Sequence, residues 1–439
     1  MNLRSFTLGL RLAFGVCVSF LVFADVLAET DVQAPAVSRT SPHNEVKGAI
    51  DGRTVRLLAV GDILFHRPLI RALKLERSAA PSTHTPLADS IHQDWIGAPE
   101  AEVSWPFSLL RHLANRAELV VGNLETPINE RRLEPPKPMR FSSPMFIAEQ
   151  LAAAGFSALS IANNHSYDQG QRGLSETLEH LKTHGVLSFG LSENGTPYPP
   201  TFVERNGISF AFIGYSFLTN RLPDPLNDKE AQINLISKRQ RRGRKARLKT
   251  LDKLIRGAQE KADYVIVSVH WGEEYMTTPN QEQQRLAKRM TQAGADLILG
   301  HHPHVLQPVM RYERTDDEAA IVAYSLGNYV ANQSYYYNLF SSPLIPNQAT
   351  TRDSVILEFE FSPVSTPGSE KSVTISAHPV WLVNRPSYQE HRKAGRRVEP
   401  RLISELQDLK EYQEMKRFQR RLEKRKRIIL RTLGVEEAQ

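Results

Sequence analysis

Short apolar runs alternate with longer amphipathic segments between about residues 54 and 362. The short runs are rich in β-branched residues and predict strands, whereas the longer segments repeat apolar residues every three or four positions and predict helices. This alternation indicates an α/β domain. The Asn206-Gly207 pair between two apolar runs predicts a hairpin. The predicted strands are 55–60, 119–121, 158–161, 208–215, 264–269, 297–299, 321–324 and 355–361, and the predicted helices are 68–77, 107–115, 144–154, 170–183, 240–261 and 281–293.

The N-terminal 28 residues have the pattern of a secretory signal peptide. Arg4 and Arg11 precede an apolar run of 13 residues, residues 12–24, which is too short to span a bilayer comfortably. Ala28 supplies a small residue for cleavage, so we expect a secreted, periplasmic or cell-envelope protein; an uncleaved N-terminal membrane anchor is the alternative. Residues 29–52 are polar and rich in Pro, Ser and Thr, which predicts a disordered linker.

The positive charge of the chain is concentrated at its C-terminal end. The 439 residues include 55 Lys and Arg against 48 Asp and Glu, a net charge of +7. Residues 391–439 contain 15 of these cations and 8 of the acids, so the rest of the chain is balanced. Periodic apolar residues over 403–433 predict a basic helical tail after a domain of residues 53–390. A second basic run occupies residues 238–249.

These two basic runs have two interpretations. Both can be solvated helix faces, or they can contact an anionic surface or polymer, such as lipid headgroups or a polycarboxylate. We do not expect nucleic acid as a partner, because an exported chain without a nucleic-acid-binding module offers no basis for one.

Cysteine usage restricts the chemistry that the chain can perform. Cys17 is the single cysteine and lies inside the apolar run of the predicted signal peptide. An intrachain disulfide and a cysteine-ligated zinc site are therefore excluded, and any metal must be held by His, Asp, Glu and Asn.

Five predicted strands lead directly into short polar motifs. Because the carboxyl ends of strands in an α/β sheet lie at one edge, where ligand sites form, we expect these side chains to converge. A structural role in turns and loops is the alternative for each motif. In chain order the motifs are Gly61-Asp62, Gly122-Asn123-Leu124-Glu125, Asn163-Asn164-His165, His270-Trp271-Gly272 and Gly300-His301-His302-Pro303-His304.

The residue types in these motifs suit a divalent metal centre. Imidazole and carboxylate groups together bind Mn, Fe and Zn. A carboxylate such as Glu125 can bridge two ions, and two ions can clamp a phosphoryl group or activate a water molecule. The sequence therefore predicts one or two divalent ions of undetermined identity.

In these motifs the chain resembles the capsule synthesis protein A (CapA) family of poly-γ-glutamate biosynthesis. The resemblance extends over about residues 55–361 and includes Asp168 and the Glu273-Glu274-Tyr275 and Tyr324-Ser325-Leu326-Gly327-Asn328 segments. That family is similar to the calcineurin-like metallophosphatases. This implies a four-layer α/β sandwich, with two central mixed β-sheets flanked by helices.

The resemblance also implies roles for individual residues. His165 corresponds to the histidine that protonates a leaving group, and Asp168 would orient it. Leu64 stands where a histidine ligand is expected, with His66 two residues further on, so a mononuclear or an unequal dinuclear site is expected. The implied metal ligands are Asp62, Glu125 (in place of a bridging Asp), Asn164, His270, His302 and His304, and the residues expected around them are His66, Asn123, Asn163, Glu274, His301 and Asn328.

We therefore expect an exported protein of capsule or poly-γ-glutamate metabolism with a metallohydrolase-type site. Metal-activated water would attack a phosphoryl or acyl centre of an anionic polymer or cell-envelope substrate, with His165 as the general acid. One alternative is a non-catalytic accessory or export component of a membrane polymer-synthesis complex, with the basic tail contacting the membrane surface or the synthase. Another is a broad phosphoesterase, because fold analogy is a poor guide to substrate.

Overall fold

The computed structural model describes residues 54–79, 105–131, 139–193, 196–221, 232–237, 242–314, 319–335, 337, 339, 346–364, 371–385, 397–409, 413 and 415–438. The predicted signal peptide, residues 1–28, and the predicted linker, residues 29–52, lie outside these ranges. Residues 51–439 form one compact unit. Among the described helices, none combines the length and the apolar character that a membrane crossing requires.

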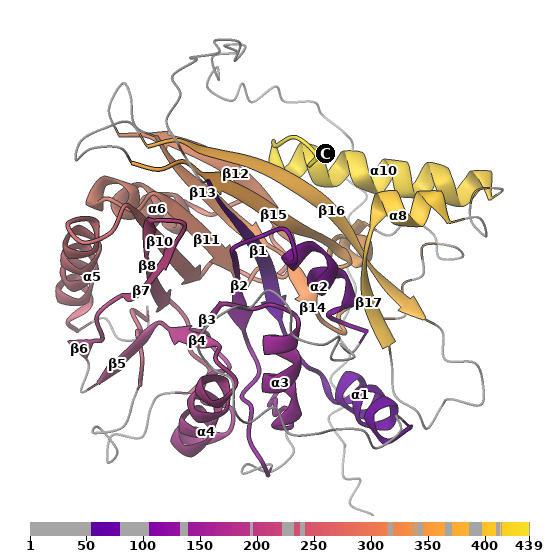
Figure 1. Cartoon of the computed structure of the whole chain (residues 1–439), viewed down its shortest axis with the longest axis horizontal. Helices are drawn as coiled ribbons and strands as arrows, with labels where there is room; N and C mark the ends of the chain where they lie inside the picture. Colours follow the sequence, from indigo (N-terminus) through magenta and orange to yellow (C-terminus); the bar gives the residue numbers. More distant parts are fainter. Residues whose placement is uncertain are drawn as a thin grey trace, which may run out of the picture. The chain divides into compact units, whose positions relative to one another are not determined.

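Two mixed β-sheets lie at the centre of this unit (Figure 1). The larger sheet contains β1 (Val55–Ile63), β2 (Leu119–Leu124), β3 (Ala158–Ser160), β4 (Leu187–Phe189), β14 (Asn328–Val330), β15 (Asp353–Phe361), β16 (Val373–Arg385) and β17 (Arg397–Leu402). Its order is β17-β16-β15-β1-β2-β3-β4, with β14 also paired to β1. Strands β1 to β4 run parallel, whereas β15, β16 and β17 add antiparallel pairs.

The second sheet repeats this design. It contains β7 (Thr201–Arg205), β8 (Ile208–Ser216), β10 (Tyr264–His270), β11 (Leu297–His301), β12 (Leu306–Glu313) and β13 (Ala319–Leu326). Its order is β12-β13-β11-β10-β8-β7, with parallel pairs at the centre and an antiparallel strand at each edge. A small third sheet joins β5 (Leu191–Glu193), β6 (Thr196–Pro197) and β9 (Gln232–Ile233).

Alternation of buried side chains along the strands creates separate cores on the two faces of each sheet. On β1, Leu57 and Ala59 belong to the core between the sheets, whereas Leu58 and Val60 belong to the core beneath the helices of the larger sheet. A third core lies between the second, six-stranded sheet and the helices of residues 244–259 and 281–293. The expected four-layer sandwich is confirmed. The helices are α1 (Arg67–Ala79), α2 (Ser108–Ala114), α3 (Phe146–Ala153), α4 (Gly170–Thr183), α5 (Arg244–Gln259), α6 (Gln281–Ala293), α7 (Pro346–Thr350), α8 (Ile403–Asp408) and α10 (Lys416–Leu433).

All eight predicted strands and all six predicted helices are present, and α4 and α6 have the predicted bounds. The predicted hairpin joins β7 and β8, and both Asn206 and Gly207 have positive φ angles. The prediction omitted several strands, including β12 and β16. Strand β12 lies at the edge of its sheet with its outer half exposed, so its sequence lacks a continuous apolar run.

The predicted tail helix is divided into α8 and α10. The sequence set this segment apart from the domain, but the apolar face of α10 packs into the core between the sheets. Its contacts are with β12, β15 and β16, and Figure 1 shows it lying along that side of the sandwich. The buried residues are Phe418, Leu422, Ile429 and Leu433.

A buried ion pair fixes α10 to the larger sheet. Arg425 Nε donates to Asp353 Oδ1 at 2.9 Å, and a second guanidinium nitrogen donates to Asp353 Oδ2. Burial raises the pKa of Asp353 to about 6, although Arg425 counteracts the rise. The next residue, Ser354, pairs with Gly327, whose carbonyl oxygen accepts the backbone N–H of Asp62 at 2.9 Å. The helix is therefore anchored to backbone that supports the end of β1.

Replacing Arg425 with Met should leave the buried Asp353 carboxylate without its partner. We expect the free energy of unfolding to fall by roughly 3–5 kcal/mol at neutral pH. Arg425 lowers the pKa of Asp353, so its removal should raise this pKa further, and protonation at low pH should stabilise the folded variant more than the folded parent. The loss should therefore shrink as the pH falls from about 7 toward about 4, which urea unfolding at several pH values measures.

The matched control is Arg431→Met, at an exposed position of the same helix. Its stability should stay within about 0.5 kcal/mol of the parent chain. An equal loss in both variants, or a loss in Arg425→Met that does not depend on pH, would show that the ion pair does not have this role.

Candidate metal centre

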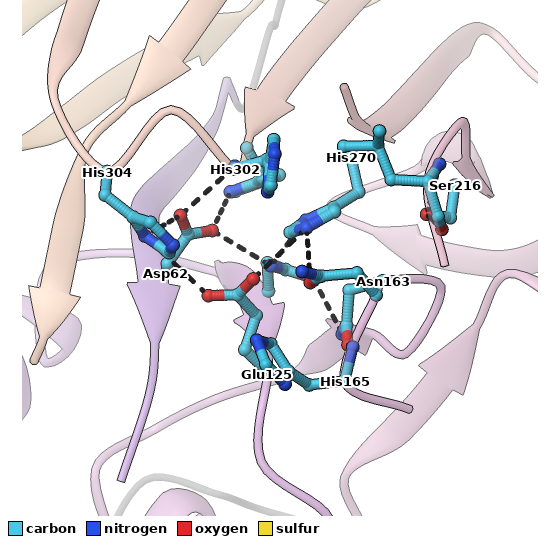
Figure 2. Close-up of polar contacts among 12 residues, drawn as sticks. Asp62, Glu125, Asn163, His165, Ser216, His270, His302 and His304 are labelled. Atoms are coloured by element: carbon cyan, nitrogen blue, oxygen red, sulfur yellow. Dashed lines mark hydrogen bonds and ion pairs between the residues drawn. The ribbon is translucent and has the colours of Figure 1, made fainter. Parts of the chain in front are cut away.

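The polar motifs of both sheets meet at the carboxyl ends of their central strands. Asp62 is the penultimate residue of β1, Glu125 follows β2, and His270 ends β10. His302 and His304 lie in the loop between β11 and β12. Figure 2 shows these five side chains pointing toward one another, although they come from distant parts of the sequence. All five are buried.

Asp62 is held by several donors. Asn123 Nδ2 donates to Asp62 Oδ1 at 2.9 Å, and the backbone N–H of His302 donates to Oδ2 at 3.2 Å. His301 Nδ1 lies 3.2 Å from Oδ1, and His304 Nδ1 lies 3.1 Å from Oδ2. Burial alone would raise the pKa of Asp62, but the hydrogen bonds and charges of His301 and His304 outweigh it and hold the pKa well below its usual range. These contacts therefore favour the ionised form of Asp62.

Glu125 is in the opposite situation. Its carboxyl group is fully buried, and neither oxygen has a hydrogen-bond partner. His270 Nε2 lies 3.1 Å from Oε1, but the same nitrogen lies 2.9 Å from Asn164 Oδ1. Burial, followed by the charge of Asp62, raises the pKa of Glu125 well above its ordinary value. A buried carboxylate without donors requires a proton or a cation.

The histidines around Glu125 differ in their affinity for protons. Burial, followed by the charge of a neighbouring histidine, lowers the pKa of both His270 and His302, the latter to about 3. His302 Nδ1 is buried without a hydrogen-bond partner. Burial opposes protonation of His304 as well, but Glu125 and Asp62 raise its pKa to about 9. Neutral imidazole nitrogens, as on His270 and His302, are the form that binds metals.

These donors fit a divalent ion. The ligand atoms of Asp62, Glu125 and His270 lie within 4.8 Å of one another, and so do those of Glu125, His302 and His304. Glu125 belongs to both groups, as expected for a carboxylate that bridges two ions. The unpartnered oxygens of Glu125 and the unpartnered Nδ1 of His302 are the atoms that such ions would satisfy.

A second pair lies beside this cluster. His165 Nδ1 lies 2.9 Å from Asp168 Oδ2, and both residues are buried. The backbone N–H of Phe141 donates to the same oxygen at 2.8 Å, and the Phe141 ring packs edge-on against the His165 ring. The geometry leaves Nε2 of His165 as the nitrogen that can exchange a proton with a substrate.

Asparagines connect the two clusters. Asn163 Nδ2 donates to Asn123 Oδ1 at 3.3 Å and to the Leu124 carbonyl at 2.7 Å, while Asn163 Oδ1 accepts the backbone N–H of His165. Through Asn123 this chain of hydrogen bonds reaches Asp62. The position of His165 is thus fixed relative to the carboxylates.

The remaining predicted residues have different surroundings. Asn328 Oδ1 lies 3.0 Å from His304 Nδ1, and His301 lies against Asp62. Glu274 is exposed, although its charge contributes to the raised pKa of Glu125. His66 belongs to neither group of ligand atoms: its Nδ1 lies 3.3 Å from the Leu64 carbonyl, and its ring packs against Phe141.

Two contacts around the site were missed from the sequence. Phe141 orients Asp168 through its backbone, and Gln333 Oε1 accepts from Asn328 Nδ2 at 2.7 Å. Neither residue follows a predicted strand, and a backbone donor leaves no mark on residue type. No pattern in the sequence could have identified them.

Close backbone approach explains two of the glycines beside candidate ligands. A Cβ on Gly61 would lie 2.1 Å from the Gly327 carbonyl oxygen, and one on Gly300 would lie 2.0 Å from the Tyr324 carbonyl oxygen. His302 and His304 themselves have positive φ angles of 96° and 57°. Such conformations are costly for residues with a Cβ, and they are found preferentially at functional sites.

Comparison with known proteins identifies the family. Residues 56–333 match the family described as bacterial capsule synthesis protein PGA_cap. The chain belongs to this family. The match covers the two sheets up to β14 and includes every candidate ligand.

Two of the curated relatives come from Bacillus species. The chain is 28% identical over 265 residues to "PGA biosynthesis protein CapA" of Bacillus subtilis (strain 168), covering 58% of this chain and 60% of that protein. It is 30% identical over 237 residues to "Capsule biosynthesis protein CapA" of Bacillus anthracis, covering 52% and 54%. The chain therefore spans less than two thirds of the length of these relatives. Among solved structures, a novel phosphatase from Mycoplasma pneumoniae aligns with 12% identity and a TM-score of 0.41, covering 75% of this chain and 94% of that one.

The variant Glu125→Gln tests whether the buried carboxylate is a metal ligand. It keeps the shape of the side chain and cannot ionise, so the metal-free chain no longer bears the cost of burying or protonating a carboxylate and should become more stable by about 1–3 kcal/mol. Metal affinity should fall by more than the roughly 10- to 100-fold that loss of an outer hydrogen-bond partner costs. Thermal melts with and without Mn²⁺ or Zn²⁺, together with elemental analysis, measure both effects.

The exposed Glu273→Gln variant is the control for the change in net charge. This variant should change neither the stability of the metal-free chain nor the metal affinity. Full metal content in Glu125→Gln would be incompatible with the assignment of Glu125 as a ligand.

Proposed function

We propose that this chain is a metal-dependent hydrolase that acts outside the cytoplasm on an anionic capsule polymer of the poly-γ-glutamate type. The observation that carries the proposal is the buried Glu125 carboxylate, which lacks hydrogen-bond donors and lies among Asp62 and three histidines. Membership of the capsule synthesis family and the printed names of the Bacillus relatives support the substrate class. The N-terminal signal-peptide pattern supports export.

The metal would be held by two overlapping sets of ligands. Asp62, Glu125 and His270, with Asn164 Oδ1 close to His270, make one set, and Glu125, His302 and His304 make the other. The side chain two residues after Asp62 is the buried, apolar Leu64, which supplies no ligand. This favours an unequal dinuclear or a mononuclear site, with Mn, Fe or Zn as the candidate ions.

A divalent ion bound there supplies Lewis acidity, which polarises the scissile bond and lowers the pKa of an attacking water molecule. The chain's own residues position the substrate and manage the protons. Asp62 remains a carboxylate because its donors hold its pKa low. Glu125, whose pKa is raised by burial, would be held in its carboxylate form by an adjacent divalent ion and would serve as its ligand.

His165 is the proposed general acid. Asp168 Oδ2 accepts a hydrogen bond from Nδ1–H, which fixes the orientation of the ring, so Nε2 can deliver a proton to the leaving group. The Phe141 backbone N–H holds the Asp168 carboxylate in the orientation that this requires. The asparagine chain from Asp62 to His165 keeps the acid at a fixed distance from the site of attack.

The proposal predicts that His165→Ala separates metal binding from catalysis. Turnover should fall by roughly 10²- to 10⁴-fold, the usual contribution of a positioned acid, while metal content stays unchanged. The assay screens poly-γ-glutamate, phosphodiesters and cell-wall peptides with the mature chain, first after treatment with EDTA and then after addition of Mn²⁺, Fe²⁺ or Zn²⁺.

The control is His180→Ala in α4, outside the described site. It should keep full activity. Undiminished turnover in His165→Ala would contradict the role of the acid, and metal binding without turnover of any substrate would favour the non-catalytic accessory role. Preference for phosphodiesters over poly-γ-glutamate would point instead to a broad phosphoesterase.

A further inference from the structure

The outer face of α10 carries a straight row of cations. We call Arg417, Arg420, Lys424, Arg427 and Arg431 the outer row; all five are exposed. Their spacing alternates between three and four residues, so they occupy one narrow face of the helix. This face lies opposite the apolar residues that pack into the core between the sheets.

The structure distinguishes these cations from those that stabilise the fold. On the inner face, Arg425 pairs with Asp353, and Arg421 donates to the Leu339 carbonyl oxygen. In the outer row, Arg427 lies 3.4 Å from Glu423. Within the part of the chain that the structure describes, the other four members make no ion pair. The outer row therefore has no structural role that explains its charge.

The position of α10 argues against insertion into a membrane. An amphipathic helix binds a bilayer by burying its apolar face among the lipids. In α10 that face already packs against the sheets, where Phe418, Leu422, Ile429 and Leu433 are buried. A membrane could therefore attract α10 only through charge, without the apolar burial that strengthens the binding of an amphipathic helix.

A linear polyanion fits the outer row better. With a rise of 1.5 Å per residue, successive cations are about 5 Å apart along the helix and the whole row extends about 21 Å. A flexible chain with one charge every few ångströms can lie along such a row and pair with each member. Four of the five cations are Arg, whose guanidinium group binds carboxylates through two parallel hydrogen bonds.

We propose that the outer row of α10 is a docking surface for a linear polycarboxylate chain, separate from the metal centre. Binding to this surface needs no catalysis. That the docked chain is also the polymer cleaved at the metal centre rests on the proposed function.

The second basic segment supplies a matched comparison. Helix α5 has four exposed cations, Lys245, Lys249, Lys253 and Arg256, of which three are Lys. Elsewhere on α5, Arg244 and Asp252 pair with Glu282 and Arg289 of α6. Removing four charges from either helix changes the net charge of the protein equally, so only the position of the charges differs.

The test measures binding of fluorescent poly-γ-glutamate to the mature chain by anisotropy, in EDTA and over a range of NaCl concentrations. In the outer-row variant, Arg417, Arg420, Lys424 and Arg431 are replaced by Gln; in the α5 variant, Lys245, Lys249, Lys253 and Arg256 are replaced by Gln. We expect the outer-row variant to bind about tenfold more weakly and with less salt dependence. The α5 variant should change by less than about twofold.

Several results would overturn the inference. Equal losses of polymer affinity in both variants would mean that binding depends on total charge. An unchanged affinity in the outer-row variant would show that the outer row is not a docking surface. Binding to phosphatidylglycerol vesicles without binding to the polymer would assign the row to membranes. Circular dichroism melts verify that both variants remain folded, which is expected because the replaced side chains are exposed.

The two proposals fail in distinguishable ways. Polymer binding that depends on the outer row, without metal-dependent turnover, would contradict the proposed function and leave the docking surface intact. If the outer-row variant keeps both its turnover at the metal centre and its affinity for the polymer, only the docking surface would be contradicted.

Discussion

The whole structure is arranged around two carboxylates that are buried together. Ligand atoms of Asp62 and Glu125 lie within 4.8 Å of each other and of an imidazole nitrogen, away from solvent. Like charges in a buried site cannot both remain ionised without compensation, and the pKa values diverge accordingly, downward for Asp62 and upward for Glu125. Donors within the protein satisfy Asp62. Glu125 remains without donors, so a bound cation would stabilise its carboxylate.

The fold provides the rigidity that such a cluster requires. Asp62, Glu125 and His270 lie at or just after the ends of buried strands, and His302 and His304 lie in the loop that follows β11. The backbones around Asp62 and His301 approach neighbouring carbonyl groups so closely that only glycine fits at positions 61 and 300. Behind β1, Gly327 and Ser354 connect the site to Asp353, and Arg425 connects Asp353 to α10. The inner face of α10 therefore supports the site through Arg425. On its outer face, within the described residues, Arg427 alone of the outer row makes an ion pair, and its partner Glu423 lies on the same helix.

Much of this arrangement could be predicted from the sequence because strand ends are local features. Glycine and polar residues directly after β-rich runs located Asp62, Glu125, His270 and the histidines after β11. The sequence also placed Leu64 where the resemblance expects a histidine ligand, and His66, expected near the ligands, lies outside both groups of ligand atoms. Contacts between distant segments of the chain could not be predicted from the sequence. The backbone bond from Phe141 to Asp168 and the packing of α10 depend on chain segments far apart in sequence, and edge strands such as β12 have no distinctive apolar run.

The central claim is that the Glu125 cluster is a divalent metal site, and diffraction at a metal absorption edge tests it most directly. Crystals of the protein would be soaked in Mn²⁺ or Zn²⁺ and measured on both sides of the edge. We predict an anomalous difference peak at bonding distance, about 2.0–2.3 Å, from a Glu125 carboxylate oxygen and from the nitrogens of His270 or of His302 and His304. An anomalous peak elsewhere in the molecule, with none beside Glu125, would contradict the account.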